Sequence, residues 1–321
     1  MAKGSRRLAL GMLLLPLVYA AVLRLNVSPP LHLGRFYLLH GGPASVSIRS
    51  DGAGEGGLEH ARMIMRRLVR GEAARRELRQ NGVACVTSDR ESNFCVTTRS
   101  VRIVAGPSLS PSVYLTAATA HNFSIRPYPR KTDPLAMSRT APVHIVSGGA
   151  APPCDVVHGT PAVVFSTGGF AGNFFHDVNE VLIPLFLTAG GFRRSTLVVT
   201  DHEHYWLSKY RPLLEHLAGD GHDNHHGGIV VASPSSRGSS AAEQRVVVHC
   251  FPAGVVGLKY HGNLVCDATA APGGVTVRHF RRFLRDALAL PSPARGAGEE
   301  KPLLVMLSRR KSRAVLNEEA A

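Results

Sequence analysis

The chain has 321 residues, of which 44% are hydrophobic, and a formal net charge of +14 at pH 7. This length accommodates one large or two medium globular domains. Its 37 Lys and Arg residues are spread along the chain and form no recognisable nucleic-acid-binding module, which argues against a nucleic-acid partner. A basic surface suits other anionic partners, such as sugar nucleotides, acidic polysaccharides or membrane headgroups.

The N-terminal residues have the pattern of a membrane anchor. Basic residues precede an uncharged run, Leu8–Leu23 (LALGMLLLPLVYAAVL), and Arg24 closes it. The pattern predicts a cytosolic tail over residues 1–7, a transmembrane signal anchor over residues 8–25 and a luminal remainder. A signal peptide that is cleaved after Ala20 is the alternative.

Five cysteines fit a luminal location. None of their spacings is the C-x-x-C that is typical of zinc sites, so two disulfides and one free thiol are expected in an oxidising lumen. Cys85 and Cys95 flank a short polar loop and are the best candidates for a pair. Buried free thiols are the alternative if the chain is cytosolic. The sequon at Asn122 (Asn-Phe-Ser) predicts N-glycosylation.

The segment before the first cysteine has no clear strand pattern. Residues 26–82 are interpreted as a stem, in which Leu58–Gln80 forms a basic amphipathic helix with a solvated surface. A helix lying on a membrane is the alternative.

Residues 83–290 show the alternation of an α/β domain. Short apolar runs predict strands at Ser100–Val104, Ser112–Leu115, Val143–Val146, Pro161–Phe165, Ser195–Thr200, Ile229–Ala232 and Arg245–His249. Helices are expected at Tyr205–Leu217 and Val275–Leu288. This order predicts a parallel sheet in a Rossmann-like domain, followed by a linker over residues 291–300 and a further strand at Pro302–Leu307.

The stretch Thr167–Phe186 (TGGFAGNFFHDVNEVLIPLF) holds the densest group of candidate site residues. Its glycines allow a sharp turn and a close approach of the backbone to another group. Five polar residues then gather in the first turns of a predicted helix: Asn173, His176, Asp177, Asn179 and Glu180. Pro184 should break or kink that helix. A helix that starts after a buried strand is a common ligand site, although helix capping with a structural His176 is the simpler alternative.

Other polar clusters are less specific. The loop Phe123–Lys131 (FSIRPYPRK) could face a sugar or a phosphate, or be an ordinary surface loop. The His-rich runs Asp201–His204 and His222–His226 match no metal-site spacing and are interpreted as loops. Arg309 and Arg313 follow the last predicted strand and could clamp a diphosphate bidentately, or form a basic surface turn.

Several motifs in one order carry a family resemblance. They are SNFC around Cys95, IRPYPRK at Ile125–Lys131, GNFFHDVNEVLIPLF at Gly172–Phe186, W-x-x-K-Y at Trp206–Tyr210, HCF at His249–Phe251, VGLKYH at Val256–His261 and LSRRKSR at Leu307–Arg313. From about Cys85 to its end, the chain resembles plant glycosyltransferase family 61, which includes the xylan arabinosyl- and xylosyltransferases of grasses.

The resemblance implies a single-pass type II Golgi membrane protein with a two-domain GT-B-like fold. In that fold, residues 83–290 would be the Rossmann-like acceptor-side domain, and residues 301–321 the start of the nucleotide-sugar-binding domain. The expected reaction transfers a pentose, xylose or arabinose, from a UDP-sugar to a cell-wall polysaccharide such as xylan, or to a glycan, with inversion. The chain has no D-x-D, so no metal cofactor is expected.

Two departures from the family pattern stand out. Val178 and Glu180 replace the usual acidic pair of H-D-F-x-D, and the chain ends at Ala321, before the late H-G-A-G-L motif of the second domain. The second departure predicts an incomplete donor domain, weak UDP binding and little transfer by the chain alone. A non-catalytic family member and a membrane-anchored or secreted carbohydrate-binding protein are therefore the alternatives.

The resemblance also suggests roles for the site residues. His176 or Asp177 would be the catalytic base or the group that orients it. Asn173 and Glu180 would hold acceptor hydroxyls, and Arg309 and Arg313 would clamp the donor diphosphate.

Overall fold

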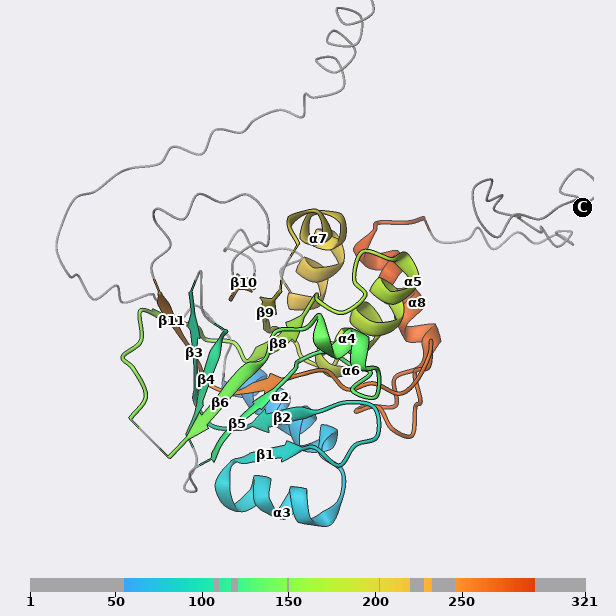
Figure 1. Ribbon diagram of the computed structural model, residues 1–321. Coiled ribbons are helices and arrows are strands. Elements are labelled where there is room, and N and C mark those ends of the chain that lie inside the picture. Colours follow the sequence, from blue (N-terminus) through green and yellow to red (C-terminus); the bar gives the residue numbers. More distant parts are fainter. Residues whose placement is uncertain are drawn as a thin grey trace, which may run out of the picture. The chain divides into compact units, whose positions relative to one another are not determined.

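Two mixed β-sheets and a layer of helices make up the part of the chain that the computed structural model describes (Figure 1). This part comprises residues 55–106, 110–116, 121–148, 150–201, 203–219, 228–232 and 246–291. The predicted anchor, residues 292–300 of the linker, the strand at Pro302–Leu307 and both Arg309 and Arg313 lie outside these residues. Within the described ranges, no helix combines the length and apolar character that a membrane crossing requires.

The first sheet contains the parallel block that the sequence predicts. Its order is β1 (Val83–Val86), β2 (Phe94–Thr97), β12 (Gly254–Val256), β8 (Ala162–Ser166), β9 (Thr196–Thr200) and β10 (Ile229–Val231). β12, β8, β9 and β10 run parallel to one another, and β2 is antiparallel to both of its neighbours, β1 and β12. All five residues of β8 are buried, as expected for a central strand that is covered on both faces.

The second sheet is mostly antiparallel. Its order is β5 (His121–Ile125), β6 (Val143–Ser147), β4 (Ser112–Leu115), β3 (Val101–Ala105), β11 (Val247–Phe251) and β7 (Val156–Val157). Only the pairs β4–β6 and β7–β11 are parallel.

The helices pack against one face of the first sheet. They are α2 (Glu55–Leu68), α3 (Glu72–Asn81), α4 (Pro134–Ser138), α5 (Phe174–His176), the π-helix η1 (Asp177–Leu182), α6 (Ile183–Ala189), α7 (His204–Ala218) and α8 (Val277–Ala287). Val163 and Phe165 of β8 face α6 and α7, whereas Ala162 and Val164 face the second sheet. The layers are therefore helices, sheet and sheet, which corrects the expectation of a Rossmann-like domain with a parallel sheet alone.

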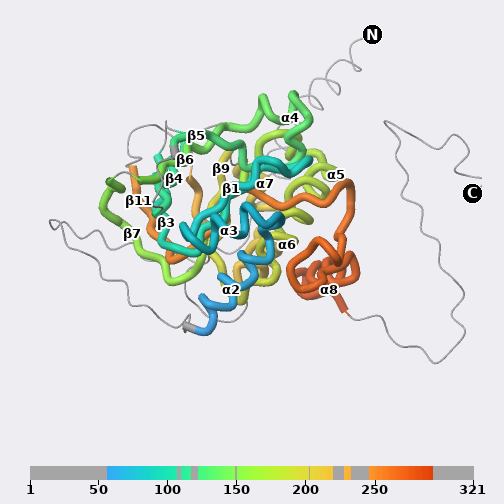
Figure 2. The backbone as a smooth tube through the Cα atoms, turned by 90° about the horizontal axis from the view of Figure 1, so that it is seen from below, coloured from blue at the N-terminus to red at the C-terminus, as the bar shows by residue number. Residues whose placement is uncertain are grey.

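Helices α2 and α3 correct the stem interpretation for residues 55–81. Ala61, Ile64, Met65 and Leu68 of α2 are buried in the main core, and α3 lies against β1 (Figure 2). The predicted single helix is two helices, separated at Gly71, which has φ of 82°. The apolar face of this amphipathic segment packs on the folded unit rather than being solvated.

Pro184 does not end its helix. Proline lacks the N–H that would bond the carbonyl four residues earlier, and its ring clashes with that carbonyl in a regular α-helix. The chain adopts the wider π-helix η1 immediately before α6, with Pro184 in the first turn of α6. This π-helix carries Asp177, Asn179 and Glu180, and π segments are frequent at functional sites.

Two disulfides and one free thiol are present among the described residues. Cys85 and Cys95 are bonded across directly opposed positions of β1 and β2. Cys154 is bonded to Cys250 of β11, and Cys266 is free and buried. The asparagine of the sequon, Asn122, is exposed on β5 at the edge of the second sheet.

Candidate functional site

The polar cluster of the central stretch lies at the carboxyl ends of two neighbouring parallel strands. After β8 the chain passes through α5, η1 and α6 to β9 on one side, whereas β12 lies on the other side of β8 (Figure 1). Ligands of α/β proteins commonly bind outside the carboxyl ends of parallel strands.

Glycines bring the loop after β8 into close contact with two tyrosines. Gly169 has φ of 64°, and a Cβ there would lie 2.5 Å from the ring of Tyr128. Gly172 has φ of 101°, and a Cβ there would collide with the hydroxyl of Tyr205. The sharp turn and close approach that these glycines predict are therefore confirmed.

His176 and Glu180 form a hydrogen-bonded pair one helical turn apart. Nδ1 of His176 lies 2.7 Å from Oε1 of Glu180. Because a carboxylate only accepts, Nδ1 carries the proton, and Nε2 of the neutral ring keeps a free lone pair. Nε2 has no hydrogen-bond partner among the described residues, and 23% of the His176 side chain is exposed. This arrangement is that of a general base with its orienting carboxylate.

Glu180 is held by further partners from the loop Phe123–Lys131. Tyr128 donates its hydroxyl to Oε2, and Nη1 of Arg130 lies 2.5 Å from Oε1. Burial and the bond to Glu180 raise the pKa of Tyr128, and the same carboxylate raises the pKa of Arg130. The Glu180 side chain is fully buried, which suits orientation of His176 better than the predicted direct contact with an acceptor hydroxyl.

The carboxylate of Asp177 is also fully buried and turned into the protein. Oδ1 accepts from the Gly172 N–H at 2.7 Å and from Nε1 of Trp206 at 2.9 Å. Oδ2 accepts from the Tyr210 hydroxyl at 2.8 Å, with Nζ of Lys209 at 3.5 Å. These contacts join η1 to α7, so the geometry favours a positioning role for Asp177 and leaves His176 as the better candidate base.

The two asparagines of the cluster have different surroundings. Asn173 is exposed and caps α5, because its Oδ1 accepts from the N–H of Phe175 at 3.0 Å. Asn179 is buried, and its Nδ2 donates to the Tyr260 hydroxyl at 3.0 Å and to Oδ1 of Asn263 at 3.1 Å. Asn179 therefore ties the π-helix to the segment that follows β12.

Sequence reasoning did not connect four of these residues to the site: Tyr128, Arg130, Tyr260 and Asn263. Both tyrosines and Arg130 stand in motifs that carry the family resemblance, IRPYPRK and VGLKYH, which was the available signal. Arg130 also has an unusual left-handed backbone, with φ of 64°. Backbone strain of this kind is concentrated at functional sites.

The other polar clusters contribute structural contacts where they are described. Oδ2 of Asp201 accepts from the Ser166 hydroxyl at 2.7 Å and from the Ala141 N–H at 2.9 Å, and burial raises the pKa of Asp201. His222–His226 lie outside the described residues. Within the described ranges, no group of three His, Cys, Asp or Glu side chains is placed to hold a metal ion.

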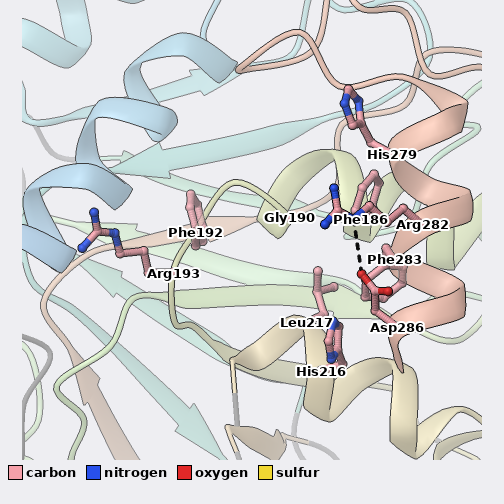
Figure 3. Close-up of a pocket in the computed structure, with 10 residues that line it drawn as sticks. All are labelled: Phe186, Gly190, Phe192, Arg193, His216, Leu217, His279, Arg282, Phe283 and Asp286. Atoms are coloured by element: carbon pink, nitrogen blue, oxygen red, sulfur yellow. Dashed lines mark ion pairs between the residues drawn. The ribbon is translucent and has the colours of Figure 1, made fainter. Parts of the chain in front are cut away.

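A separate pocket of about 260 Å³ lies between the ends of α6 and α7 and one face of α8 (Figure 3). Phe186, His216 and Phe283 line it, and Arg282 is paired with Asp286, with 3.6 Å between Nε and Oδ2. Arg193 points away from its centre (Figure 3). None of its lining residues belongs to the His176–Glu180 cluster, so this pocket is distinct from the candidate site.

Comparison with known proteins identifies homologues. An α-1,3-arabinosyltransferase of Oryza sativa subsp. japonica is 31% identical over 241 residues, which is 73% of this chain and 38% of that protein. A β-1,2-xylosyltransferase of the same plant is 35% identical over 208 residues, covering 62% of this chain and 41% of the relative. A xylan glycosyltransferase of Arabidopsis thaliana is 28% identical over 224 residues, covering 66% of this chain and 42% of the relative.

The chain thus spans about two fifths of the length of these relatives. No protein-family model matches the chain, and no solved structure matches it significantly. The homologues confirm the resemblance to plant arabinosyl- and xylosyltransferases that the ordered motifs predict.

Proposed function

We propose that this chain, a homologue of plant arabinosyl- and xylosyltransferases, forms the acceptor-side part of a pentosyltransferase acting on xylan or a related glycan. The single observation that carries the proposal is the His176–Glu180 pair, with Nε2 of His176 open at the carboxyl ends of β8 and β12. The names of the homologues support the choice of a pentose and of a xylan acceptor.

In the proposed reaction, His176 acts as the general base. Nε2 takes the proton of an acceptor hydroxyl, and the acceptor oxygen attacks C1 of the pentose from the face opposite the diphosphate. The bond between C1 and the diphosphate oxygen breaks, and its electron pair leaves with UDP. Glu180 stabilises the imidazolium that forms, because its carboxylate faces Nδ1. Tyr128 and Arg130 fix Glu180 in turn.

The donor side of the proposal rests on the sequence alone. Arg309 and Arg313 would clamp the diphosphate of a UDP-sugar in a second, GT-B-like domain, and no step is assigned to a metal ion. The charge pattern before and after Leu8–Leu23 supports a single-pass type II location in the Golgi membrane. Asn122 should then carry a glycan; a mobility unaffected by glycosidase, and by Asn122→Gln, would contradict the luminal location.

The decisive experiment replaces the matching segment of a rice relative with the corresponding segment of this chain and measures pentose transfer to xylan oligosaccharides. UDP-xylose and UDP-arabinose serve as donors. We expect transfer by the chimera and a loss of 10²-fold or more with His176→Ala, as is typical for a general base. His144→Ala, which removes an exposed histidine of β6, is the matched control and should retain activity. Equal rates for the two variants would refute the assignment of the base.

A further inference from the structure

Exposed aromatic side chains are confined to one place in the described part of the chain. Phe174 is 69% exposed, Phe175 is 44% exposed and Tyr205 is 52% exposed, whereas every other described Phe, Tyr or Trp is buried or half-buried. Phe174 and Phe175 immediately precede His176 in α5, and Tyr205 lies in the first turn of α7. A group of large apolar side chains that the fold leaves uncovered commonly marks an interaction site.

Contacts with neighbouring residues hold the rings of Phe174, Phe175 and Tyr205 in place. Asn173 caps the helix that carries Phe174 and Phe175, and the ring of Phe175 meets the His176 ring edge-on at 5.3 Å. Tyr205 lies against the backbone of Gly172, where the left-handed turn leaves room for its hydroxyl. Lys209, one turn after Tyr205, places its ammonium 5.6 Å from the centre of the Phe174 ring. A preorganised surface of this kind loses little freedom on binding.

Polar groups lie among the rings rather than only around them. The Lys209 ammonium faces the Phe174 ring, the His176 ring meets the Phe175 ring, and the Tyr205 hydroxyl lies beside Gly172; the Lys209 side chain is 45% exposed. A purely apolar partner would bury this ammonium at a penalty, whereas a sugar ring offers both kinds of contact. The C–H face of a sugar packs on the negative face of an aromatic ring, and its hydroxyls bond to the polar groups.

From this geometry we propose that Phe174, Phe175 and Tyr205 form a stacking platform for the acceptor, which binds the pentose units adjacent to the one that is glycosylated. The inference rests on the proposed function, because it places the acceptor chain beside Nε2 of His176. It adds residues to the site that were not predicted to contact a sugar, and it specifies an acceptor of several linked pyranose units.

The test measures binding of neutral xylohexaose to the full chain by titration calorimetry or by NMR, without any donor. Phe174→Ala and Tyr205→Ala should each weaken binding by about tenfold, whereas Phe174→Tyr, which keeps the ring, should bind like the unsubstituted chain. Val157→Ala is the control, since Val157 is an apolar side chain that is 61% exposed on the second sheet. Because all the substituted side chains are exposed, circular dichroism should show an unchanged fold.

Three results would overturn the platform. These are an absence of xylohexaose binding by the unsubstituted chain, unchanged binding by both alanine variants, and weaker self-association or protein binding with unchanged sugar binding. The last of these would identify the surface as a protein interface. If the alanine variants bind normally while His176→Ala abolishes transfer, the platform fails and the proposed function stands. If they lose binding while His176→Ala transfers normally, the assigned base fails and the platform stands.

Discussion

Replacing Asp177 tests whether its carboxylate positions the site or takes part in catalysis. Asp177→Ala leaves two buried donors without their acceptor, Nε1 of Trp206 and the Tyr210 hydroxyl, and it also removes the acceptor of the exposed Gly172 N–H. An unsatisfied buried donor costs about 1–3 kcal/mol, and the loss of one partner from a buried charged network costs roughly 3–5 kcal/mol. Water that enters the vacated space lowers the sum, so we expect the free energy of unfolding to fall by about 3–5 kcal/mol.

His176→Ala should have the opposite effect, with a small loss of stability and a large loss of transfer. The His176 side chain is partly exposed, and Glu180 keeps its bonds to Tyr128 and Arg130 when the imidazole is removed. The free energy of unfolding should therefore fall by only about 1 kcal/mol. Transfer should nevertheless drop by roughly 10²- to 10⁴-fold, because the general base is missing.

The assay is urea unfolding followed by circular dichroism, combined with transfer by the same variants of the chimera, measured at a low temperature where Asp177→Ala is still folded. Folded Asp177→Ala should keep transfer within about tenfold of the unsubstituted protein, because its contacts are structural. The reasoning is refuted if Asp177→Ala is as stable as the unsubstituted protein within about 1 kcal/mol and yet loses transfer as completely as His176→Ala.

Two further predictions concern titratable groups outside the site. Burial and the neighbouring His249 lower the pKa of His158 to about 4, below the value of about 6.5 expected in the unfolded chain. Between about pH 4 and pH 6.5 the unfolded chain therefore binds more protons than the folded chain, so the free energy of unfolding should fall by roughly 1 kcal/mol from pH 7 to pH 5. His158→Gln should flatten this pH dependence. An unchanged slope in that variant would contradict the prediction. Burial raises the pKa of the free thiol of Cys266, so alkylation at pH 8 should be at least about tenfold slower in the native chain than in urea, and rapid native labelling would contradict this.

Local patterns in the sequence predicted the individual elements around the site well. The continuous apolar run at Pro161–Phe165 corresponds to β8, and the glycines after it form the predicted close turn. Ser112–Leu115 is a strand with the predicted bounds. These features depend on residues near one another in the chain, so their hydrophobic periodicity and their turn residues can be recognised without knowledge of the fold.

Features that depend on long-range pairing could not be obtained in this way. An apolar strand has the same pattern whether it joins the first sheet or the second, so the second sheet was not predicted. Tyr128 and Arg130 are 52 and 50 residues from Glu180, and only the fold brings them together. The apolar face of residues 58–80 was visible in the sequence, but an amphipathic pattern does not show what the face packs against, so the packing of α2 in the core was not predicted.

The close contact between Gly169 and Tyr128 permits a final test with a matched control. Gly169 has φ of 64° and Gly273 has φ of 78°, so alanine is strained by a similar backbone effect of about 1–2 kcal/mol at both positions. A Cβ at Gly273 meets nothing within 4 Å, whereas a Cβ at Gly169 lies 2.5 Å from the buried ring of Tyr128.

Gly169→Ala must therefore displace that ring, which costs a further 1–3 kcal/mol or so and disturbs the bond from Tyr128 to Glu180. We expect urea unfolding to show a loss of about 2–5 kcal/mol for Gly169→Ala and of about 1–2 kcal/mol for Gly273→Ala. Because Glu180 orients His176, folded Gly169→Ala should also transfer more slowly than folded Gly273→Ala. Equal stability and equal transfer by the two variants would mean that the contact between the glycine turn and Tyr128 does not support the site.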